Sequence, residues 1–241
     1  MVSSNKAAEF FFNTSKIRFS WKRHRLINLH YFSIRPVGAF WVNDAGESPE
    51  PFTVILKTDI ESGKWRPRNP DLVEHVKKYC DALEHSDKQS LVIWPYHCLV
   101  GSSGHNVNGF IFDALLAWTE KYNKNVQYVM KGQNALTEHY SALAADVPIE
   151  EDKSTMLNRA LMDKFEDASD IVVCGQARSH CVNHTVRDII QNLRNKAHAS
   201  KIVLLDDAMS NVSGFDAVGD AFMNYCREAG VNVSTCSKLS L

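Results

Sequence analysis

Cys181 is the residue whose setting most clearly suggests chemistry. An apolar run that ends at Cys174 is followed by a short polar loop, and Cys181 lies at the start of a stretch with helical spacing. Backbone N–H groups at a helix N-terminus favour a thiolate, which is the nucleophilic form of cysteine. Many cysteines instead pack as small apolar side chains, and that is the structural alternative here. The strand-loop-helix setting favours a nucleophile.

Three further side chains are expected to reach the same place as Cys181. Trp94 and His97 follow one predicted strand, and Lys131 follows another. In an open parallel sheet, ligands bind outside the carboxyl ends of the strands. A lysine at the end of a strand is often only a surface residue, and that is the alternative interpretation of Lys131. We nevertheless expect all four residues at one edge of the sheet.

The elements that must position these residues follow an alternating pattern. From about residue 50, short apolar runs alternate with amphipathic helical patterns, which indicates βαβ units and a mostly parallel sheet. Asn69 followed by Pro70 is typical of a helix start. The expected strands are 90–94, 126–130, 171–174, 201–205 and 231–233, and the expected helices are 70–84, 110–122, 154–165, 181–194 and 216–229.

Length and composition limit the classes of protein. The chain has 241 residues, of which 44% are hydrophobic and 23% charged, and no apolar run approaches the roughly 20 residues that span a bilayer. The net charge of -1 favours a small-molecule partner over nucleic acid or a membrane. Six cysteines without CxxC pairs or a secretory segment indicate free thiols and a cytoplasmic protein.

The first 39 residues differ from the rest of the chain. No acidic residue lies between Glu9 and Asp44, whereas six basic residues do. We expect 1–39 to be an atypical segment, partly disordered or a displaced strand, and 40–241 to be the main domain. Organellar targeting is a minor alternative, and a shortened or misread chain start is another.

Three motifs carry a resemblance to a known family. Residues 94–104, 129–132 and 175–182 resemble signatures of the nicotinamidase/isochorismatase-like cysteine hydrolases, and the resemblance covers roughly residues 40 to 235. Residues 40–46 and 132–142 further resemble a longer nicotinamidase-like branch. The resemblance implies a three-layer αβα fold with a mostly parallel central sheet. It also implies hydrolysis of nicotinamide or a related small amide, a reaction of pyridine nucleotide salvage in NAD metabolism.

The resemblance also implies roles for individual residues. Cys181 would be the nucleophile that forms a thioester, and Lys131 would assist it. The backbone N–H groups of Ala177 and Cys181 would hold the oxyanion, with a non-proline cis peptide between Gln176 and Ala177. Trp94 would form an aromatic wall for a pyridine ring, and Gln176 would contact the substrate.

A metal site is a weaker implication of the resemblance. His97 corresponds to a family ligand, and Asn28 and His30 are the nearest counterparts of the family's Asp-x-His ligands. Imidazole suits zinc, iron or manganese, but asparagine is a weak ligand, so cation affinity would be reduced. The structural alternatives are a strand residue for His30 and a hydrogen-bonded loop residue for His97.

The chain departs from the family at the catalytic aspartate. The family places it at the end of its first strand, yet no aspartate precedes Asp44 here. Asp44 and Asp59 lie in polar stretches, and Glu9 is a remote substitute. Losing one member of such a triad typically costs several powers of ten in rate. The chain is therefore either a small-amide hydrolase, impaired or using another base, or an inactive binding module; a homo-oligomer is compatible with both.

Overall fold

The main structural element is a six-stranded parallel sheet. The computed structural model describes residues 8–12, 24–31, 40–99 and 102–239, with only the backbone of the first two ranges. The strands are β1 (Ala8–Phe12), β2 (His24–Tyr31), β7 (Gln127–Lys131), β8 (Asp170–Gln176), β9 (Ile202–Ser210) and β10 (Asn232–Ser234). Their order is β10-β9-β8-β1-β2-β7, and all five pairings are parallel. The expected parallel α/β sheet is confirmed.

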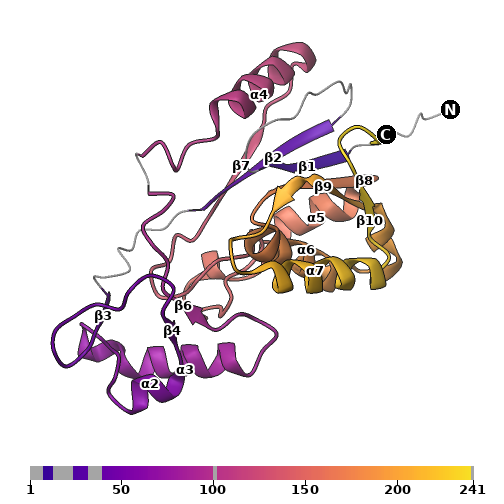
Figure 1. The fold of residues 1–241 in the computed structure, drawn as a ribbon. Helices are drawn as coiled ribbons and strands as arrows, with labels where there is room; N and C mark the ends of the chain where they lie inside the picture. Colours follow the sequence, from indigo (N-terminus) through magenta and orange to yellow (C-terminus); the bar gives the residue numbers. More distant parts are fainter. Residues whose placement is uncertain (1–7, 13–23, 32–39, 100–101, 240–241) are drawn as a thin grey trace.

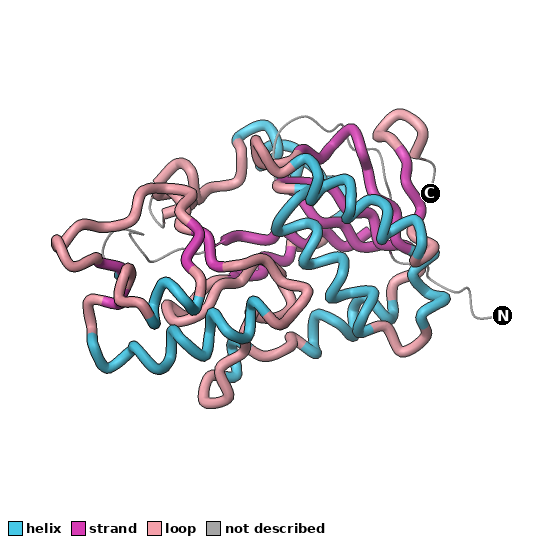
Figure 2. Tube along the Cα trace, turned by 60° about the horizontal axis from the view of Figure 1, so that its bottom comes forward, coloured by secondary structure: helices cyan, strands magenta, loops and turns pink. Residues whose placement is uncertain are grey.

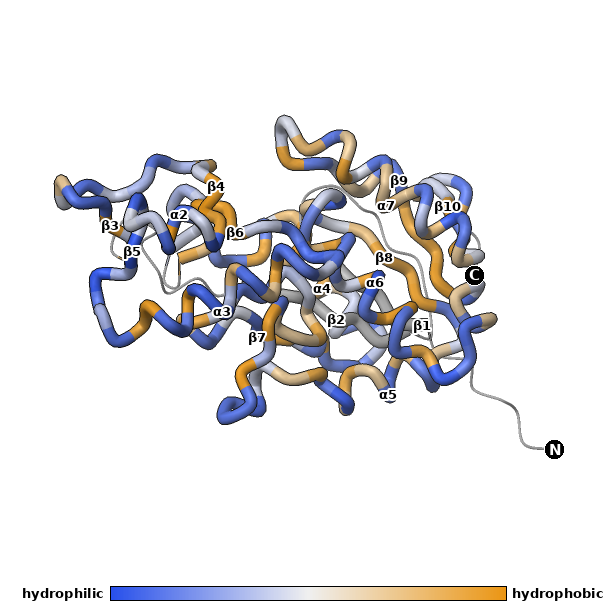
Figure 3. Tube along the Cα trace, turned by 90° about the horizontal axis from the view of Figure 1, so that it is seen from below, coloured by the Kyte–Doolittle hydropathy of each residue, from blue (hydrophilic) through white to orange (hydrophobic). Residues whose placement is uncertain are grey.

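Helices cover both faces of this sheet (Figure 1). The helices are α4 (Gly109–Tyr122), α5 (Arg159–Asp167), α6 (Asn183–Asn192) and α7 (Asp216–Glu228). Alternate residues of β8 point to opposite faces, as the pleat requires. Val172 and Cys174 pack with the buried side of α4, whereas Ile171 and Val173 pack with α5, α6 and α7. These contacts establish the three expected layers, and Figure 3 shows the hydrophobic course of β8 between them.

Asparagine side chains set where several helices begin. Asn69 and Asn108 accept backbone N–H groups at the starts of a 3₁₀ turn, η1 (Pro70–Leu72), and of α4. The helix expected over 154–165 begins only at Arg159, because Asn158 caps it by accepting the Leu161 N–H. A separate 3₁₀ turn, η2 (Lys153–Thr155), precedes it, and η4 (Lys196–Lys201) precedes β9.

Residues 40–93 form a lobe beside the sheet. Its elements are β3 (Trp41–Val42), β4 (Val54–Ile55), α2 (Lys57–Glu61), β5 (Arg66–Pro67), α3 (Val73–Glu84) and β6 (Leu91–Val92). The lobe has its own apolar core, centred on Ile55, Tyr79 and Leu83. Figure 2 shows its short strands away from the main sheet.

A strand, β6, forms within the predicted run 90–94, but it does not join the parallel sheet, so the placement that the alternating pattern indicated was wrong. β6 pairs antiparallel with β4, and the Ile93 N–H donates to Thr53 O at 2.9 Å. A short apolar run fits either sheet by periodicity alone, and only its partner decides between them. Pro95 follows at once and cannot donate to a longer ladder.

The N-terminal strands belong to the sheet. β1 lies between β8 and β2. On one side of β1 the strands follow in the order β2, β7, and on the other side in the order β8, β9, β10. Ligands bind at such a topological switch point, outside the carboxyl ends of the strands. The division of the chain between residues 39 and 40 stays a prediction. No helix in the described ranges is long and apolar enough to cross a bilayer.

Candidate active site

The connection from β8 to α6 forms the centre of the site. The peptide between Gln176 and Ala177 is cis, as the sequence resemblance implies. A π-helical turn, η3 (Arg178–Val182), follows and carries the half-buried Cys181. The Ala177 carbonyl accepts the N–H groups of His180 at 3.0 Å and Val182 at 3.1 Å. Ala177 and Cys181 therefore lie on one tight turn, at the switch point of the sheet.

Lys131, the last residue of β7, reaches this turn from the side. Its side chain is buried, and Nζ donates to the carbonyls of His139 and Tyr140, each at 2.7 Å. Its third contact is with Cys181 Sγ at 3.2 Å. A buried Nζ with these three contacts is fixed in position beside the sulfur. The structure thus brings together the two residues expected to share the chemistry.

A cavity of about 340 Å³ opens beside Cys181. It is lined by Phe52, Trp94, Pro95, His97, Cys98, Tyr140, Gln176, Ala177, His180, Cys181 and Val212. Trp94 lines this cavity, and its Nε1–H donates to the Tyr140 hydroxyl at 2.6 Å. Gln176 also lines the cavity, where its Oε1 accepts from the Ser210 hydroxyl at 2.7 Å. Aromatic walls with few polar groups are typical of sites for small planar ligands.

Several cavity residues were missed at the sequence level. Phe52 lies outside the motif stretches and packs edge-on against Trp94, with ring centroids 5.7 Å apart. The sequence signal for Tyr140 was its position within residues 132–142, the stretch that resembles the nicotinamidase-like branch. His180 directly precedes Cys181, which could have suggested it.

The other cysteines differ from Cys181 in their surroundings. Burial raises the pKa of Cys80 and of Cys226 to about 12, and that of Cys236 to about 11. Cys98 lines the same cavity as Cys181, and burial raises its pKa as well. None of these four makes the lysine contact that Cys181 makes.

The residues expected to hold a metal are only partly described. His97 is exposed, and its Nδ1 is 2.8 Å from Pro95 O. Asn28 and His30 belong to β2, whose side chains lie outside the described part of the structure. Among the described residues, no group of three side chains could hold a metal ion. The metal site implied by the resemblance therefore stays a prediction, and no chemical step below uses a metal.

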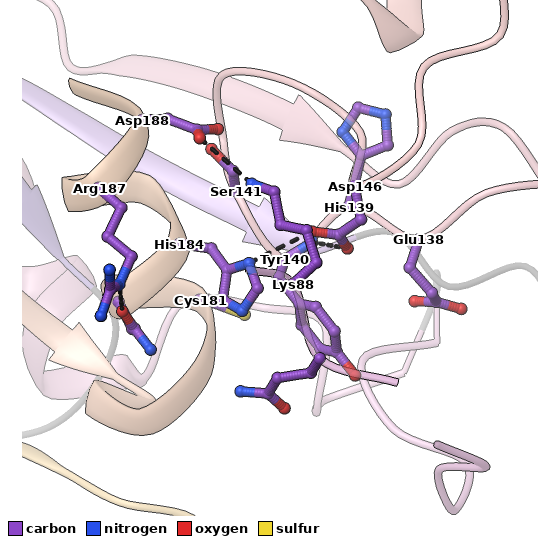
Figure 4. Close-up of polar contacts among 12 residues, drawn as sticks. Lys88, Glu138, His139, Tyr140, Ser141, Asp146, Cys181, His184, Arg187 and Asp188 are labelled. Atoms are coloured by element: carbon purple, nitrogen blue, oxygen red, sulfur yellow. Dashed lines mark hydrogen bonds and ion pairs between the residues drawn. The ribbon is translucent and has the colours of Figure 1, made fainter. Parts of the chain in front are cut away.

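A carboxylate lies near the turn, although no aspartate precedes residue 44. Asp146 Oδ2 accepts the Tyr140 N–H at 3.2 Å, and Oδ1 lies 3.2 Å from His184 Nδ1. Figure 4 shows His184 and Asp146 facing each other. Asp146 therefore holds the backbone of Tyr140, whose carbonyl in turn holds Lys131. Nothing in the sequence marked Asp146, because its role depends on how the loop folds back.

Comparison with known structures supports the class of fold. The fold of this chain resembles that of several solved nicotinamidases. The Acinetobacter baumanii nicotinamidase/pyrazinamidase matches over 99% of this chain and 100% of its own, with a TM-score of 0.56 and 14% identity. Yeast nicotinamidase Pnc1p matches over 94% and 98%, with a TM-score of 0.56 and 14% identity.

A third structure is that of PnC1 from L. infantum, in complex with nicotinate. It matches over 100% of this chain and 98% of its own, with a TM-score of 0.52 and 17% identity. No protein-family model matches the chain, and no curated protein matches it by sequence. At these identities the likeness shows the fold, and the isochorismatase-like α/β fold implied by the sequence motifs is confirmed.

Proposed function

We propose that this chain is a small-amide hydrolase that converts nicotinamide, or a closely related aromatic amide, to the acid and ammonia. The observation that carries the proposal is the 3.2 Å contact between Lys131 Nζ and Cys181 Sγ at the edge of an aromatic cavity. A nucleophile beside a proton donor is the arrangement that covalent amide hydrolysis needs. The product acid would enter pyridine nucleotide salvage.

The first half-reaction forms a thioester. The Cys181 thiolate attacks the amide carbonyl carbon, and the oxygen takes the negative charge. The N–H groups of Ala177 and Cys181 are placed on the turn to stabilise that oxyanion. The C–N bond then breaks, and the Lys131 ammonium gives its proton to the departing amine, which leaves as ammonia.

The second half-reaction releases the acid. Neutral Lys131 takes a proton from a water molecule as the water attacks the thioester carbonyl. Collapse of this intermediate breaks the C–S bond, releases the carboxylic acid and restores the thiolate and the ammonium. The lysine thereby serves as acid and then as base, which supplies a base without the family's aspartate.

Ammonia release from nicotinamide tests the proposal. We expect turnover by the wild type and a loss of at least about 10,000-fold in Cys181→Ala, because removing the nucleophile of such a unit abolishes the covalent route. A thioester trapped by acid quenching and found by mass spectrometry on Cys181 would support the mechanism. Equal rates for both proteins would instead favour a binding module, the alternative suggested by the absence of aspartate before Asp44.

A further inference from the structure

Residues 206–212, at the end of β9 and just beyond it, lie against the turn that carries Cys181. The Val212 N–H donates to the Ser179 hydroxyl at 3.0 Å, and Val212 also lines the cavity. The neighbouring Arg178 side chain makes two further hydrogen bonds to the same segment. Arg178 is not among the described residues that line the cavity, so any effect it has on chemistry must pass through the turn.

The guanidinium of Arg178 contacts two acceptors at once. Nη1 donates to Asp206 Oδ1 at 2.8 Å, and Nε donates to Asn211 Oδ1 at 3.0 Å. The side chain of Arg178 is 20% exposed, and that of Asp206 is 50% exposed. A pair this exposed adds little to the free energy of unfolding, because water solvates both charges when the pair is broken. Loss of the pair should therefore change the position of the turn more than the stability of the fold.

Asn211 is itself held by α7. Its Nδ2 donates to Asp216 Oδ1 at 2.9 Å. A Cβ atom at Gly219 would lie 2.0 Å from Asn211 Oδ1, so the amide packs directly against the backbone of the helix. Only glycine leaves room for this close approach. Arg178 thus connects the turn both to the end of β9 and, through Asn211, to α7.

The position of this turn decides where two backbone N–H groups point. In the proposed function, Ala177 and Cys181 supply these groups to the oxyanion, and Arg178 directly follows Ala177. Such donors act only at about 3 Å from the oxyanion, and a displacement of about 1 Å can cost about 100-fold in rate. The side chain that fixes the backbone of residue 178 therefore bears on the transition state.

We propose that Arg178 is a positioning residue, which holds the oxyanion donors of Ala177 and Cys181 in place through Asp206 and Asn211. This inference rests on the proposed function for the reaction itself. The oxyanion develops only in the transition state, so losing these contacts lowers kcat and leaves KM for the amide nearly unchanged. A guanidinium suits this role, because its planar fork reaches two acceptors where an ammonium is a single point charge.

Steady-state kinetics of Arg178→Met with nicotinamide test this role. We expect kcat to fall by about 10- to 100-fold while KM stays within about twofold. Arg178→Lys, which keeps a cation for Asp206, should recover part of the rate. Arg194→Met is a matched control and should retain kcat, because Arg194 forms an ion pair with Asp163 at 2.7 Å and does not line the cavity. A change confined to KM in Arg178→Met, or no change at all, overturns the proposal.

Two reagents for Cys181 separate a displaced oxyanion site from an altered thiol. The aldehyde analogue of nicotinamide accepts the thiolate at its carbonyl carbon, so a C–S bond forms, the carbonyl oxygen becomes an oxyanion, and no group leaves. Iodoacetamide also forms a C–S bond, but it releases iodide without an oxyanion. Arg178→Met should raise the dissociation constant of the aldehyde by about tenfold or more. The alkylation rate should stay within about threefold of the wild-type rate.

Protection of Cys181 from alkylation measures the dissociation constant of the aldehyde, and this assay needs no turnover. Arg194→Met should match the wild type with both reagents. An unchanged constant in Arg178→Met overturns the proposal. An equal change with both reagents also overturns it, because the effect would then lie on the sulfur rather than on the oxyanion donors.

Gly219→Ala is a second variant, which leaves Arg178 and Cys181 as they are. Its Cβ would lie 2.0 Å from Asn211 Oδ1, so the amide must move away from Arg178 Nε. We expect weaker aldehyde binding than in the wild type, with a smaller effect than in Arg178→Met because the Asp206 contact remains. Aldehyde binding equal to that of the wild type would contradict the part assigned to Asn211.

The two proposals fail in different ways. If the wild type releases ammonia and Arg178→Met behaves like Arg194→Met, the amidase function stands and the role of Arg178 falls. If the wild type releases no ammonia but binds the aldehyde more tightly than Arg178→Met does, the positioning role stands and amide hydrolysis falls. A wild type that neither releases ammonia nor binds the aldehyde overturns both.

Discussion

Two pairs of polar side chains lie close to the first turn after β8, and they differ in what surrounds them. Lys131 contacts Cys181 at 3.2 Å beside the 340 Å³ cavity. Asp146 contacts His184 at 3.2 Å with side chains only 1% and 5% exposed, and that pair stabilises the loop through Tyr140. His184 instead contributes to a separate surface depression of about 360 Å³. Both pairs hold close polar contacts, so in the proposed function it is access to the ligand cavity that separates the catalytic pair from the structural one.

Removing the lysine from the first pair should have the largest effect. Lys131→Met is expected to lower kcat/KM for nicotinamide by about 1,000-fold, because the amine loses its proton donor and the thiolate its counter-charge. Lys77→Met is a matched control, since Lys77 forms a surface ion pair with Glu74 and does not line the cavity beside Cys181. A loss of less than tenfold in Lys131→Met would show that the two pairs do not differ as argued.

The rates of alkylation compare Cys181, which contacts a lysine, with buried cysteines that lack this lysine contact. Iodoacetamide at neutral pH should alkylate Cys181 at least about 100-fold faster than Cys80 or Cys226, whose pKa values burial raises to about 12. Peptide mapping by mass spectrometry measures the site and rate. Preferential labelling of Cys98 or Cys226 would remove Cys181 as the nucleophile.

Acid should weaken the fold through two buried histidines near the site. Burial lowers the pKa of His139 and of His180 to about 4, against about 6.5 for an exposed histidine. Between those pH values the unfolded chain binds protons that the folded chain does not, so stability is present above pH 6.5 and is lost as the pH falls toward 4. Each histidine is expected to contribute a slope of up to about 1.4 kcal/mol per pH unit.

Urea unfolding at pH 7, 6, 5 and 4 measures this loss. His180→Phe should reduce the slope by about half, because one of the two protonation sites is removed. An unchanged slope in that variant would mean that His180 is not buried as a neutral ring.

The second pair should matter for stability more than for reactivity. His184→Leu is expected to lower the free energy of unfolding by about 1–3 kcal/mol, because buried Asp146 loses a polar partner. The alkylation rate of Cys181 should stay within about threefold of the wild-type rate. A much slower alkylation would show that His184 acts on the sulfur and that both pairs belong to one reactive unit.

Local patterns allowed the prediction of the sheet and of the principal pair. Cys181 and Lys131 each follow an apolar strand, and parallel strands end at a common edge, so their proximity could be expected. Asn69 likewise marked a helix start through its capping chemistry. The run at 90–94 could not be assigned to the right sheet, because a two-residue pairing leaves no periodic signal. Trp94 reaches the cavity all the same, from the lobe rather than from the main sheet.

The sequence by itself determined the alternation of strands and helices, the cysteine at the start of a helical turn and the absence of an aspartate before Asp44. Only the tertiary structure decided that the carbonyls of Tyr140 and His139 accept from Lys131, and that Asp146 supports this loop. It also decided that the buried Nε2 atom of His180 has no hydrogen-bond partner among the described residues. The physical reason is that strand and helix patterns arise from neighbouring residues. A hydrogen-bond partner from a distant loop depends on how the whole chain packs.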